Sequence, residues 1–227
     1  MNHELTIVKT ADGSNTIYNP QVGENYHSRH GAVQESLHVF VNSGLQYFLD
    51  ANQGTTSVSI LEVGLGTGLN FLLSAEFCSD KETALDYTGI EAYPLSLEMI
   101  RQTGHDRYAS EELWSRFVLN YERLLLLPVE MRANCQLQIA NCKLMDFHSE
   151  KQYDIIYFDA FASARQPEMW DGDAITHTVQ FLKPGGVFVT YAITGNLKRA
   201  LKALGCKVEK APGAPGKREM LRAVKLL

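Results

Sequence analysis

A glycine-rich loop is the first place in this sequence where residue types and spacing could do chemistry. Residues 64–68 read GLGTG and directly follow a strand-like run at 60–63 (ILEV), and an acidic residue, Glu91, comes 23 residues after Gly68. Glycines let the chain turn sharply and bring backbone amides against a ligand, because no Cβ intervenes. A carboxylate at the end of the next strand can accept hydrogen bonds from ribose hydroxyls. The combination predicts a site for an adenosine-containing cofactor, and the alternative is a purely structural turn.

The spacing of these glycines selects among adenosine cofactors. Dinucleotide-binding loops have the pattern GxGxxG, whereas here the third glycine comes one residue early and Glu62 precedes the loop. This ExGxGxG pattern resembles the first motif of the class I S-adenosylmethionine-dependent methyltransferases. Their cofactor carries no phosphate, and an acidic residue near the turn suits its amino-acid moiety. The resemblance implies S-adenosyl-L-methionine as the cofactor.

Asp159 is the second candidate, since it ends the apolar, strand-like run 154–158. In the fold that the glycine motif implies, the end of this strand borders the methyl group to be transferred. An amine attacks only as a free base, and a carboxylate within hydrogen-bond distance can bind the ammonium, accept its proton and orient its lone pair. We therefore predict Asp159 as the catalytic residue of an N-methyltransferase, with Phe161 as a pocket wall. The alternative role of Asp159 is to cap the following loop.

The elements that must position these residues alternate between strands and helices. Continuous apolar strands between helices indicate a parallel sheet covered on both faces. The last two strands are close enough in sequence to form an antiparallel end. The prediction is an α/β, Rossmann-like class I methyltransferase fold with a mostly parallel seven-stranded sheet, whose ligands bind beyond the carboxyl ends of the strands. The seven strands are predicted at 58–63, 87–91, 136–140, 153–158, 187–191, 207–211 and 220–224, and the helices at 69–77, from Pro94 onward, in an insertion at 105–130 and at 196–204.

The first 50 residues are predicted to form a separate N-terminal part. Turn formers surround short β-prone pieces in residues 1–25, which indicates a small β appendage. Apolar residues then recur on one helical face from 32 to 49, which predicts a helix. The predicted domains are residues 1–50, the appendage and helix, and residues 51–227, the S-adenosyl-L-methionine-binding methyltransferase domain.

Composition narrows the class of protein. The 227 residues are 45% hydrophobic and 21% charged, as in a globular protein. No apolar run approaches the roughly 18 residues that a bilayer span needs. The four cysteines are scattered, and His27, His30 and His38 are more typical of polar packing than of metal ligands. We expect a cytoplasmic protein with reduced thiols, no membrane association and no metal.

The net charge of −5 conceals an asymmetry. Residues 1–182 hold 11 Lys and Arg against 24 Asp and Glu, whereas residues 183–227 hold 10 Lys and Arg against Glu209 and Glu219. A basic segment on an acidic body can form an anion-binding face, for instance for nucleic acid, or it can simply decorate solvent-facing helices. The overall acidity argues against broad, non-specific affinity for nucleic acid.

Four parts of the sequence resemble the methyltransferase family of the bacterial bifunctional tRNA-modifying enzyme MnmC, which also exists as stand-alone, MnmD-like proteins. They are 26–40 (YHSRHGAVQESLHVF), 61–72 (LEVGLGTGLNFL), 158–161 (FDAF) with 167–170 (PEMW), and 216–221 (GKREML). The resemblance covers essentially the whole chain. It implies N-methylation of 5-aminomethyl-(2-thio)uridine at the tRNA wobble position, with Asp159 as the catalytic aspartate. The cofactor positions that it implies are Glu62, Gly64, Gly66, Gly68, Asn70 and Glu91.

The chain departs from this family at the end of the third predicted strand, where Ala140 and Asn141 stand in place of Gly-Asp. The Asn141 amide can still bond adenine, so Asn141 is kept as a cofactor residue. The loop after Asp159 carries Ala160 and Ser163 where the family often has Gly and Pro. The FAD-dependent oxidase half of the bifunctional enzyme has no counterpart here, so another enzyme would have to supply the aminomethyl uridine.

The resemblance gives the basic segment a role in holding the tRNA anticodon stem-loop. The residues expected to contact phosphates are Lys198, Arg199, Lys202, Lys217 and Arg218, with Arg165 beside the catalytic loop. Phe161 or Trp170 could stack on a splayed-out base, or either could pack in the core. Glu35 is expected to line the cofactor or uridine site with His27, Ser28, Gln34 and His38; the alternative is that Glu35 and Ser36 are ordinary polar residues of a helix.

Two rival functions are open at this point. An aminopropyltransferase of the spermidine synthase type shares the fold and an aspartate-bound amine, but it has no use for a strongly basic segment. A methyltransferase that acts on another small amine is an alternative closer to the predicted function. A non-catalytic subunit would keep the fold only to bind a partner, and it has no need of an intact glycine loop, Glu91 or Asp159.

Overall fold

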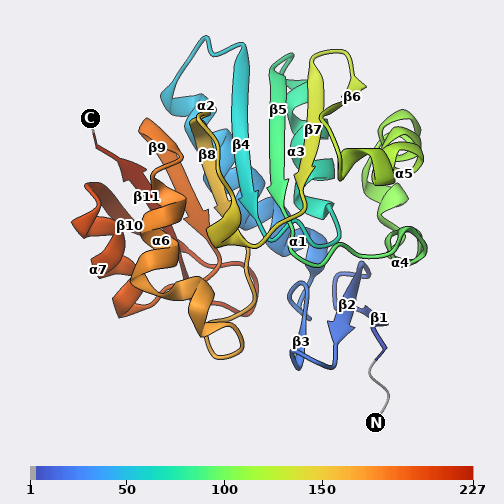
Figure 1. Ribbon diagram of the computed structural model, residues 1–227, viewed down its shortest axis with the longest axis horizontal. Helices are drawn as coiled ribbons and strands as arrows, with labels where there is room; N and C mark the ends of the chain where they lie inside the picture. Colours follow the sequence, from blue (N-terminus) through green and yellow to red (C-terminus); the bar gives the residue numbers. More distant parts are fainter. Residues whose placement is uncertain (1–3, 227) are drawn as a thin grey trace.

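The main sheet of the computed structural model, which describes residues 4–226, has eight strands in the order β10-β11-β9-β8-β4-β5-β7-β6 (Figure 1). The five strands from β9 to β7 run parallel, and β11 is antiparallel to both of its neighbours. The predicted Rossmann-like sheet with an antiparallel end is confirmed. The strands are β4 (Ser57–Val63), β5 (Ala84–Ile90), β6 (Val129–Arg132), β7 (Cys135–Ala140), β8 (Tyr153–Phe158), β9 (Leu182–Thr190), β10 (Cys206–Pro212) and β11 (Glu219–Lys225).

The eighth strand, β6, corrects the predicted count of seven. It lies at the end of the segment predicted as a helical insertion, but it forms an antiparallel hairpin with β7. Val129 and Met131 are buried while Glu130 is exposed, which is the alternation of a strand with one buried face. Asn134, whose φ is 60°, makes the tight connection to β7. A four-residue alternation is too short to stand out beside the helical pattern that precedes it.

Helices cover both faces of this sheet, because its strands are apolar on both sides. Ile60 of β4 packs in a core cluster with Phe71, whereas its neighbour Leu61 packs in a second cluster with Ile175 and Leu197. Figure 1 accordingly shows α6 and α7 in front of the sheet and α3 behind it. The helices are α3 (Leu69–Asp80), α4 (Leu97–Gln102), α5 (Glu111–Leu124), α6 (Gly172–Val179) and α7 (Gly195–Ala203), with short 3₁₀ turns η2 (His105–Tyr108), η3 (Leu144–Asp146) and η4 (Pro167–Trp170).

The N-terminal part is a small antiparallel sheet followed by one long helical segment. Its strands are β1 (Thr6–Lys9), β2 (Asn15–Asn19) and β3 (Glu24–Asn25), which confirms the β appendage. The helical segment runs without a break through α1 (Ala32–Ser36), the π-helical η1 (Leu37–Gln46) and α2 (Tyr47–Ala51), so the helix predicted at 32–49 is also confirmed. It shares a core cluster with the strands that follow, and the domain boundary at residue 50 stays a prediction.

Two buried histidines join the N-terminal part to the glycine loop. The Nε2 atoms of His27 and His105 lie 2.9 and 3.2 Å from Oγ1 of Thr67. His27 is 9% exposed and His105 is fully buried. Burial lowers the pKa of His27 to about 4 and the pKa of His105 to about 3. Both rings are therefore neutral at neutral pH, and the Thr67 hydroxyl bridges them.

Neither imidazole is expected to gain a proton between about pH 7.5 and about pH 5.5 in the folded protein. Because their folded pKa values lie below the roughly 6.5 of free histidine, the unfolded chain binds more protons in this range. Each ring's contribution to stability is thus present above pH ~6.5 and is lost as the pH falls. Histidine ¹H–¹³C spectra across the range test this, with free imidazole as the internal reference. Ring resonances of His27 or His105 that titrate together with the reference would contradict it.

Candidate active site

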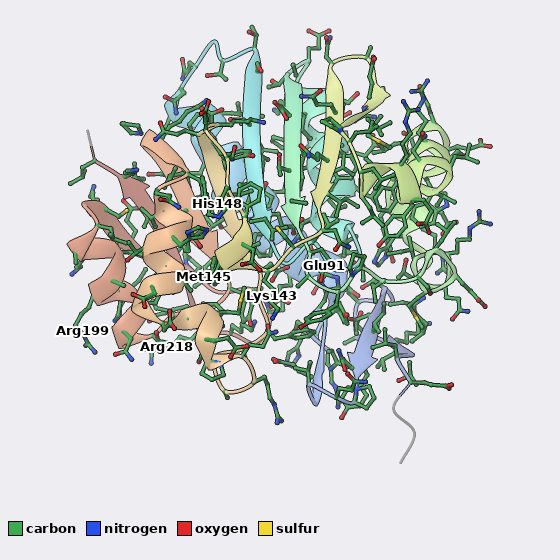
Figure 2. The ribbon with its side chains drawn as sticks, in the orientation of Figure 1. Glu91, Lys143, Met145, His148, Arg199 and Arg218 are labelled. Atoms are coloured by element: carbon green, nitrogen blue, oxygen red, sulfur yellow. The ribbon has the colours of Figure 1, made fainter. Side chains whose placement is uncertain are left out.

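A cavity of about 1330 Å³ opens at the carboxyl ends of β4, β5 and β8. Its lining residues come from the glycine loop, from the loops after β5, β7 and β8, and from the segment 19–29 of the N-terminal part. Figure 2 shows Glu91 at the end of β5, with Lys143 and Met145 at the same lower edge of the sheet. This edge is where a sheet of this topology binds its ligands.

At the edge of the cavity the glycine loop lies against two other segments, the loop after β8 and the N-terminal segment around Tyr26. Gly64, Gly66 and Gly68 have φ values of 87°, 53° and 76°, in the left-handed region that other residues rarely adopt. A Cβ on Gly64 would lie 2.7 Å from the backbone oxygen of Asp159, and one on Gly66 would lie 2.9 Å from the Tyr26 ring. Gly64 and Gly66 line the cavity, whereas Gly68 caps the first turn of α3.

Glu91 holds this loop from the neighbouring strand end. Its Oε2 accepts a hydrogen bond from the Gly66 amide and its Oε1 accepts one from the Tyr93 amide, both at 2.9 Å. Burial raises the pKa of the Glu91 carboxyl, and these two amide donors lower it. The side chain also lines the cavity. Each carboxylate oxygen has a lone pair left for a further donor, so Glu91 has the chemistry to bind a ribose diol.

Asp159 faces the cavity where β8 ends. Its backbone amide donates to the Val63 oxygen at 2.9 Å, which extends the pairing of β8 with β4 up to the cavity. Its Oδ2 accepts a hydrogen bond from Nδ2 of Asn70, also at 2.9 Å. Burial and the Glu35 carboxylate raise the pKa of Asp159 to about 8, while the Asn70 hydrogen bond and Lys217 lower it. A carboxyl that titrates near neutrality can accept and return a proton, as a general base must.

A buried row of polar side chains lies behind Asp159. Asn70 Nδ2 donates a second hydrogen bond, to Oε1 of Glu62 at 2.7 Å, and the Tyr87 hydroxyl donates to Oε2 of Glu62 at 2.8 Å. Glu62 and Tyr87 are fully buried and Asn70 is 2% exposed. The lining of the cavity contains none of the three. The structure therefore places Glu62 and Asn70, two predicted cofactor residues, behind the predicted catalytic residue.

An ion pair closes another side of the cavity. The Lys217 ammonium lies 2.6 Å from Oε1 of Glu35 and 3.8 Å from the centre of the Tyr191 ring. Oε2 of Glu35 accepts a hydrogen bond from the Ser28 amide at 2.9 Å. The Tyr191 hydroxyl donates to the Ala160 oxygen at 2.9 Å, next to Asp159. Both predicted substrate residues, Glu35 and Lys217, thus line the cavity together.

The aromatic residues after β8 have separate roles. The Phe161 ring lines the cavity and packs edge-on against Tyr26, with ring centres 5.1 Å apart. Trp170 is buried against Phe158, and its Nε1 donates to the Phe161 oxygen at 2.7 Å. Phe161 is therefore the aromatic that a ligand can meet, and Trp170 holds its backbone from the core.

Three other predicted site residues, Asn141, Arg165 and Arg218, lie outside the cavity lining. Asn141 is exposed, one residue before the lining residue Cys142. The Arg165 guanidinium lies against Gly23 of the N-terminal part. Arg218 is exposed, and Figure 2 shows it with Arg199 on the same lower side of the molecule as the cavity residues Lys143 and Met145. Of the predicted N-terminal group, His27, Ser28 and Glu35 line the cavity, whereas Gln34 and His38 do not.

Three tyrosines of the site were missed by the sequence analysis. Tyr26, Tyr93 and Tyr191 all line the cavity. Tyr26 is the first residue of the family-like segment 26–40, and Tyr191 directly follows β9. The rule that ligands bind beyond strand ends could have identified Tyr191, because it applies to every parallel strand.

Two further features bear on the expected ligands. Among residues 4–226, no group of three or more His, Cys, Asp and Glu side chains is arranged to hold a metal ion. No helix in that range is long and apolar enough to cross a lipid bilayer.

In this parallel sheet the glycine loop after β4 lies beside Glu91, the acidic residue that follows β5. This arrangement defines an α/β enzyme that binds an adenosine cofactor. The sequence profile of the S-adenosyl-L-methionine-dependent methyltransferases matches residues 106–226. The chain belongs to this family, and its cofactor is S-adenosyl-L-methionine. The cavity fits that molecule, because it is large enough and is lined by Glu91 together with Gly64 and Gly66.

Similar proteins include the bifunctional proteins MnmC of Nitrosospira multiformis and Delftia acidovorans, which are named for tRNA 5-methylaminomethyl-2-thiouridine biosynthesis. They are 30% and 31% identical to this chain over 219 residues, which is 91% and 92% of this chain but 35% and 33% of those proteins. The chain therefore spans about a third of the length of these relatives.

Solved structures agree on the fold. MnmC2 from Aquifex aeolicus matches with a TM-score of 0.76 and 22% identity, over 99% of this chain and 71% of that one. A magnesium protoporphyrin IX methyltransferase from Synechocystis, solved with bound SAH, matches with a TM-score of 0.52 and 12% identity, over 86% of this chain and 84% of that one.

Proposed function

We propose that this chain transfers a methyl group from S-adenosyl-L-methionine to the amine of 5-aminomethyl-(2-thio)uridine at the wobble position of tRNA. The observation that carries the proposal is the Asp159 carboxyl, which faces the cavity at the end of β8 and is held there by a hydrogen bond from Asn70. The family supports methyl transfer, and the names of the MnmC relatives support a tRNA uridine as the acceptor.

The proposed reaction needs the acceptor amine as a free base. S-adenosyl-L-methionine supplies an electrophilic methyl group on a positively charged sulfur. Asp159 binds the incoming ammonium and accepts one of its protons on a carboxylate oxygen. The amine nitrogen then bonds the methyl carbon and displaces a neutral thioether. The methylated ammonium leaves, and Asp159 returns its proton to solvent.

Binding of a positively charged acceptor would also favour the ionised form of Asp159, the proposed base. In the protein alone, burial and Glu35 hold the pKa of Asp159 at about 8, so much of the carboxyl is protonated near neutral pH. An opposite charge within hydrogen-bond distance favours the carboxylate form. Binding of the ammonium therefore lowers the pKa of Asp159 and prepares it to accept a proton. Lys217 offsets the opposing effect of Glu35 through their ion pair.

The same proposal assigns the cofactor to the strand ends beside Asp159. Glu91 would bind the ribose, and the backbone of Gly64 and Gly66 would face the cofactor. Asn141 would reach the adenine from the loop after β7, and Phe161 would meet the acceptor base. Glu62, Gly68 and Asn70 would support this surface from behind.

Incubation with S-adenosyl-L-methionine and tRNA that carries 5-aminomethyl-2-thiouridine tests the proposed function. Nucleoside mass spectrometry is expected to show one added methyl group on that nucleoside, and tRNA with an unmodified wobble uridine serves as the control. The proposal fails if the aminomethyl nucleoside stays unmethylated. It also fails if putrescine with decarboxylated S-adenosylmethionine is the better substrate pair, as an aminopropyltransferase would require.

Two exposed arginines on the same lower side of the molecule as the cavity, Arg199 and Arg218, are expected to hold the tRNA backbone. Reversal of charge at Arg199 and Arg218 should weaken tRNA binding about 10- to 100-fold at moderate salt and reduce the slope of log affinity against log salt by about 2, since two phosphate contacts are lost. Cofactor affinity should not change. Filter binding across a salt series measures this.

Lys207→Glu is the matched control for these arginines. Lys207 is also a basic residue of the C-terminal segment, but it lies at the opposite end of β10, far from the strand ends that form the cavity. Equal loss of tRNA affinity from Lys207→Glu and from the double arginine variant would contradict a specific contact face.

A further inference from the structure

We infer that Asn70 is a positioning residue for Asp159: its amide nitrogen joins Asp159 to the buried carboxyl of Glu62 and holds the Asp159 side chain in its cavity-facing orientation. Nδ2 lies 2.9 Å from Oδ2 of Asp159 and 2.7 Å from Oε1 of Glu62. An amide nitrogen carries two protons, so it donates one to each carboxyl group. The inference rests on the proposed role of Asp159 as the base.

The location of Asn70 makes this contact hard to replace. It lies in the first turn of α3, directly after the glycine loop, and it is 2% exposed. Its other amide atom, Oδ1, is also buried and has no hydrogen-bond partner. An unmet acceptor costs free energy, so the two donated hydrogen bonds must determine which way the amide faces. Removal of the Asn70 side chain would take the same buried donor from both carboxyl groups.

The amide is itself fixed from the core side. The second oxygen of Glu62 accepts the Tyr87 hydroxyl at 2.8 Å. The Tyr87 ring packs against Phe71 and Tyr157, with ring centres 5.2 and 6.2 Å away. Glu62 therefore cannot swing toward another donor, and the Asn70 nitrogen stays between the two carboxyl groups.

The Asn70 hydrogen bond shifts the pKa of Asp159 in a definite direction. A hydrogen bond donated to a carboxylate favours the charged form, so the Asn70 contact lowers the pKa of Asp159 against the opposing effects of burial and Glu35. Loss of the contact leaves a base that is protonated over a wider pH range. Asn70 thus sets the fraction of Asp159 that is ready to accept a proton, although the lining of the cavity does not include Asn70.

Direct titration of Asp159 tests the inference without any substrate. Carboxyl ¹³C NMR of Asp-labelled protein, with the Asp159 signal assigned from Asp159→Asn, follows its protonation. In Asn70→Ala the midpoint is expected to rise by about one to two pH units, the range for a hydrogen bond to a charged group. Ser74→Ala is the matched control: Ser74 is buried one turn further along α3, where its hydroxyl lies 3.1 Å from that of Tyr157. It should leave the Asp159 midpoint unchanged.

Turnover then separates a positioning role from a cofactor-binding one. Asn70→Ala is expected to keep its affinity for S-adenosyl-L-methionine, to lose about 10- to 100-fold in kcat at neutral pH, and to recover activity as the pH is raised. A large loss of cofactor affinity together with an unshifted Asp159 midpoint would overturn the inference. Methylation that fails even with wild-type protein, beside a shifted midpoint, would reject the proposed function and leave the assignment of Asn70 intact.

A wild-type measurement covers the case in which Asn70→Ala does not fold. The side-chain ¹H–¹⁵N signals of Asn70 should move with the same midpoint as the Asp159 carboxyl, because one of the amide protons is bonded to it. Asn70 signals that stay constant while Asp159 titrates would also overturn the inference.

Discussion

Asp159→Asn is expected to lower methyl transfer about 10³-fold or more, because a positioned general base contributes ~10²- to 10⁴-fold and the amide cannot accept the proton. The replacement has nearly the same shape, so the backbone hydrogen bond to Val63 and the packing of the loop should persist. Affinity for S-adenosyl-L-methionine should change little. Single-turnover methylation and calorimetric binding of the cofactor measure the two quantities.

Asp154→Asn controls for the loss of a carboxylate from the same strand. Asp154 lies at the other end of β8, where it bonds Ser59 and Lys183 and is remote from the cavity. Turnover by Asp159→Asn at the level of Asp154→Asn would remove Asp159 from the mechanism. A loss of cofactor affinity that matches the loss of turnover would instead give Asp159 a binding role.

Glu91→Ala should have the second largest effect, a loss of about 100-fold in affinity for both S-adenosyl-L-methionine and its demethylated product. Each hydrogen bond to a charged group is worth about 1.5–3 kcal/mol, and Glu91 offers two oxygens to a ribose. The same change releases the amides of Gly66 and Tyr93, so the glycine loop also loses its anchor. Isothermal titration calorimetry of the two nucleosides measures the effect.

Asp86→Asn is the control for Glu91, since Asp86 lies near the opposite end of β5 in an ion pair with Lys151. It should bind both nucleosides as tightly as the wild type does. If Glu91→Ala binds them equally well, the ribose is held elsewhere and the assignment of this strand end is wrong.

The parts of the fold that could be predicted are those that local sequence determines. The glycine loop, Glu91 and Asp159 each follow a buried strand, and parallel strands bring their carboxyl ends to one edge whatever their order. The four residues of β6 could not be predicted in the same way. Their pairing with β7 depends on a single turn at Asn134, and the pattern before them is helical.

The contacts within the site could not be predicted, because they depend on which strands are neighbours. The family resemblance placed Asn70 among the cofactor residues. Its contact with Asp159, 89 residues further along the chain, exists because β4 lies beside β8. Likewise, Lys217 was expected to hold phosphates, whereas it also forms an ion pair with Glu35 inside the cavity. Periodicity and composition carry no information about such pairs.

The ion pair of Glu35 and Lys217 joins residues 182 positions apart, and Glu24 accepts a hydrogen bond from the amide of Ala162, 138 positions later. At translation rates of about 5–20 residues per second, roughly ten to forty seconds separate the synthesis of Glu35 from that of Lys217. For most of that interval a nascent chain on the ribosome carries the glycine loop without its completed surroundings. The site is therefore complete only after the hairpin of β10 and β11, which carries Lys217, has been synthesised and has docked.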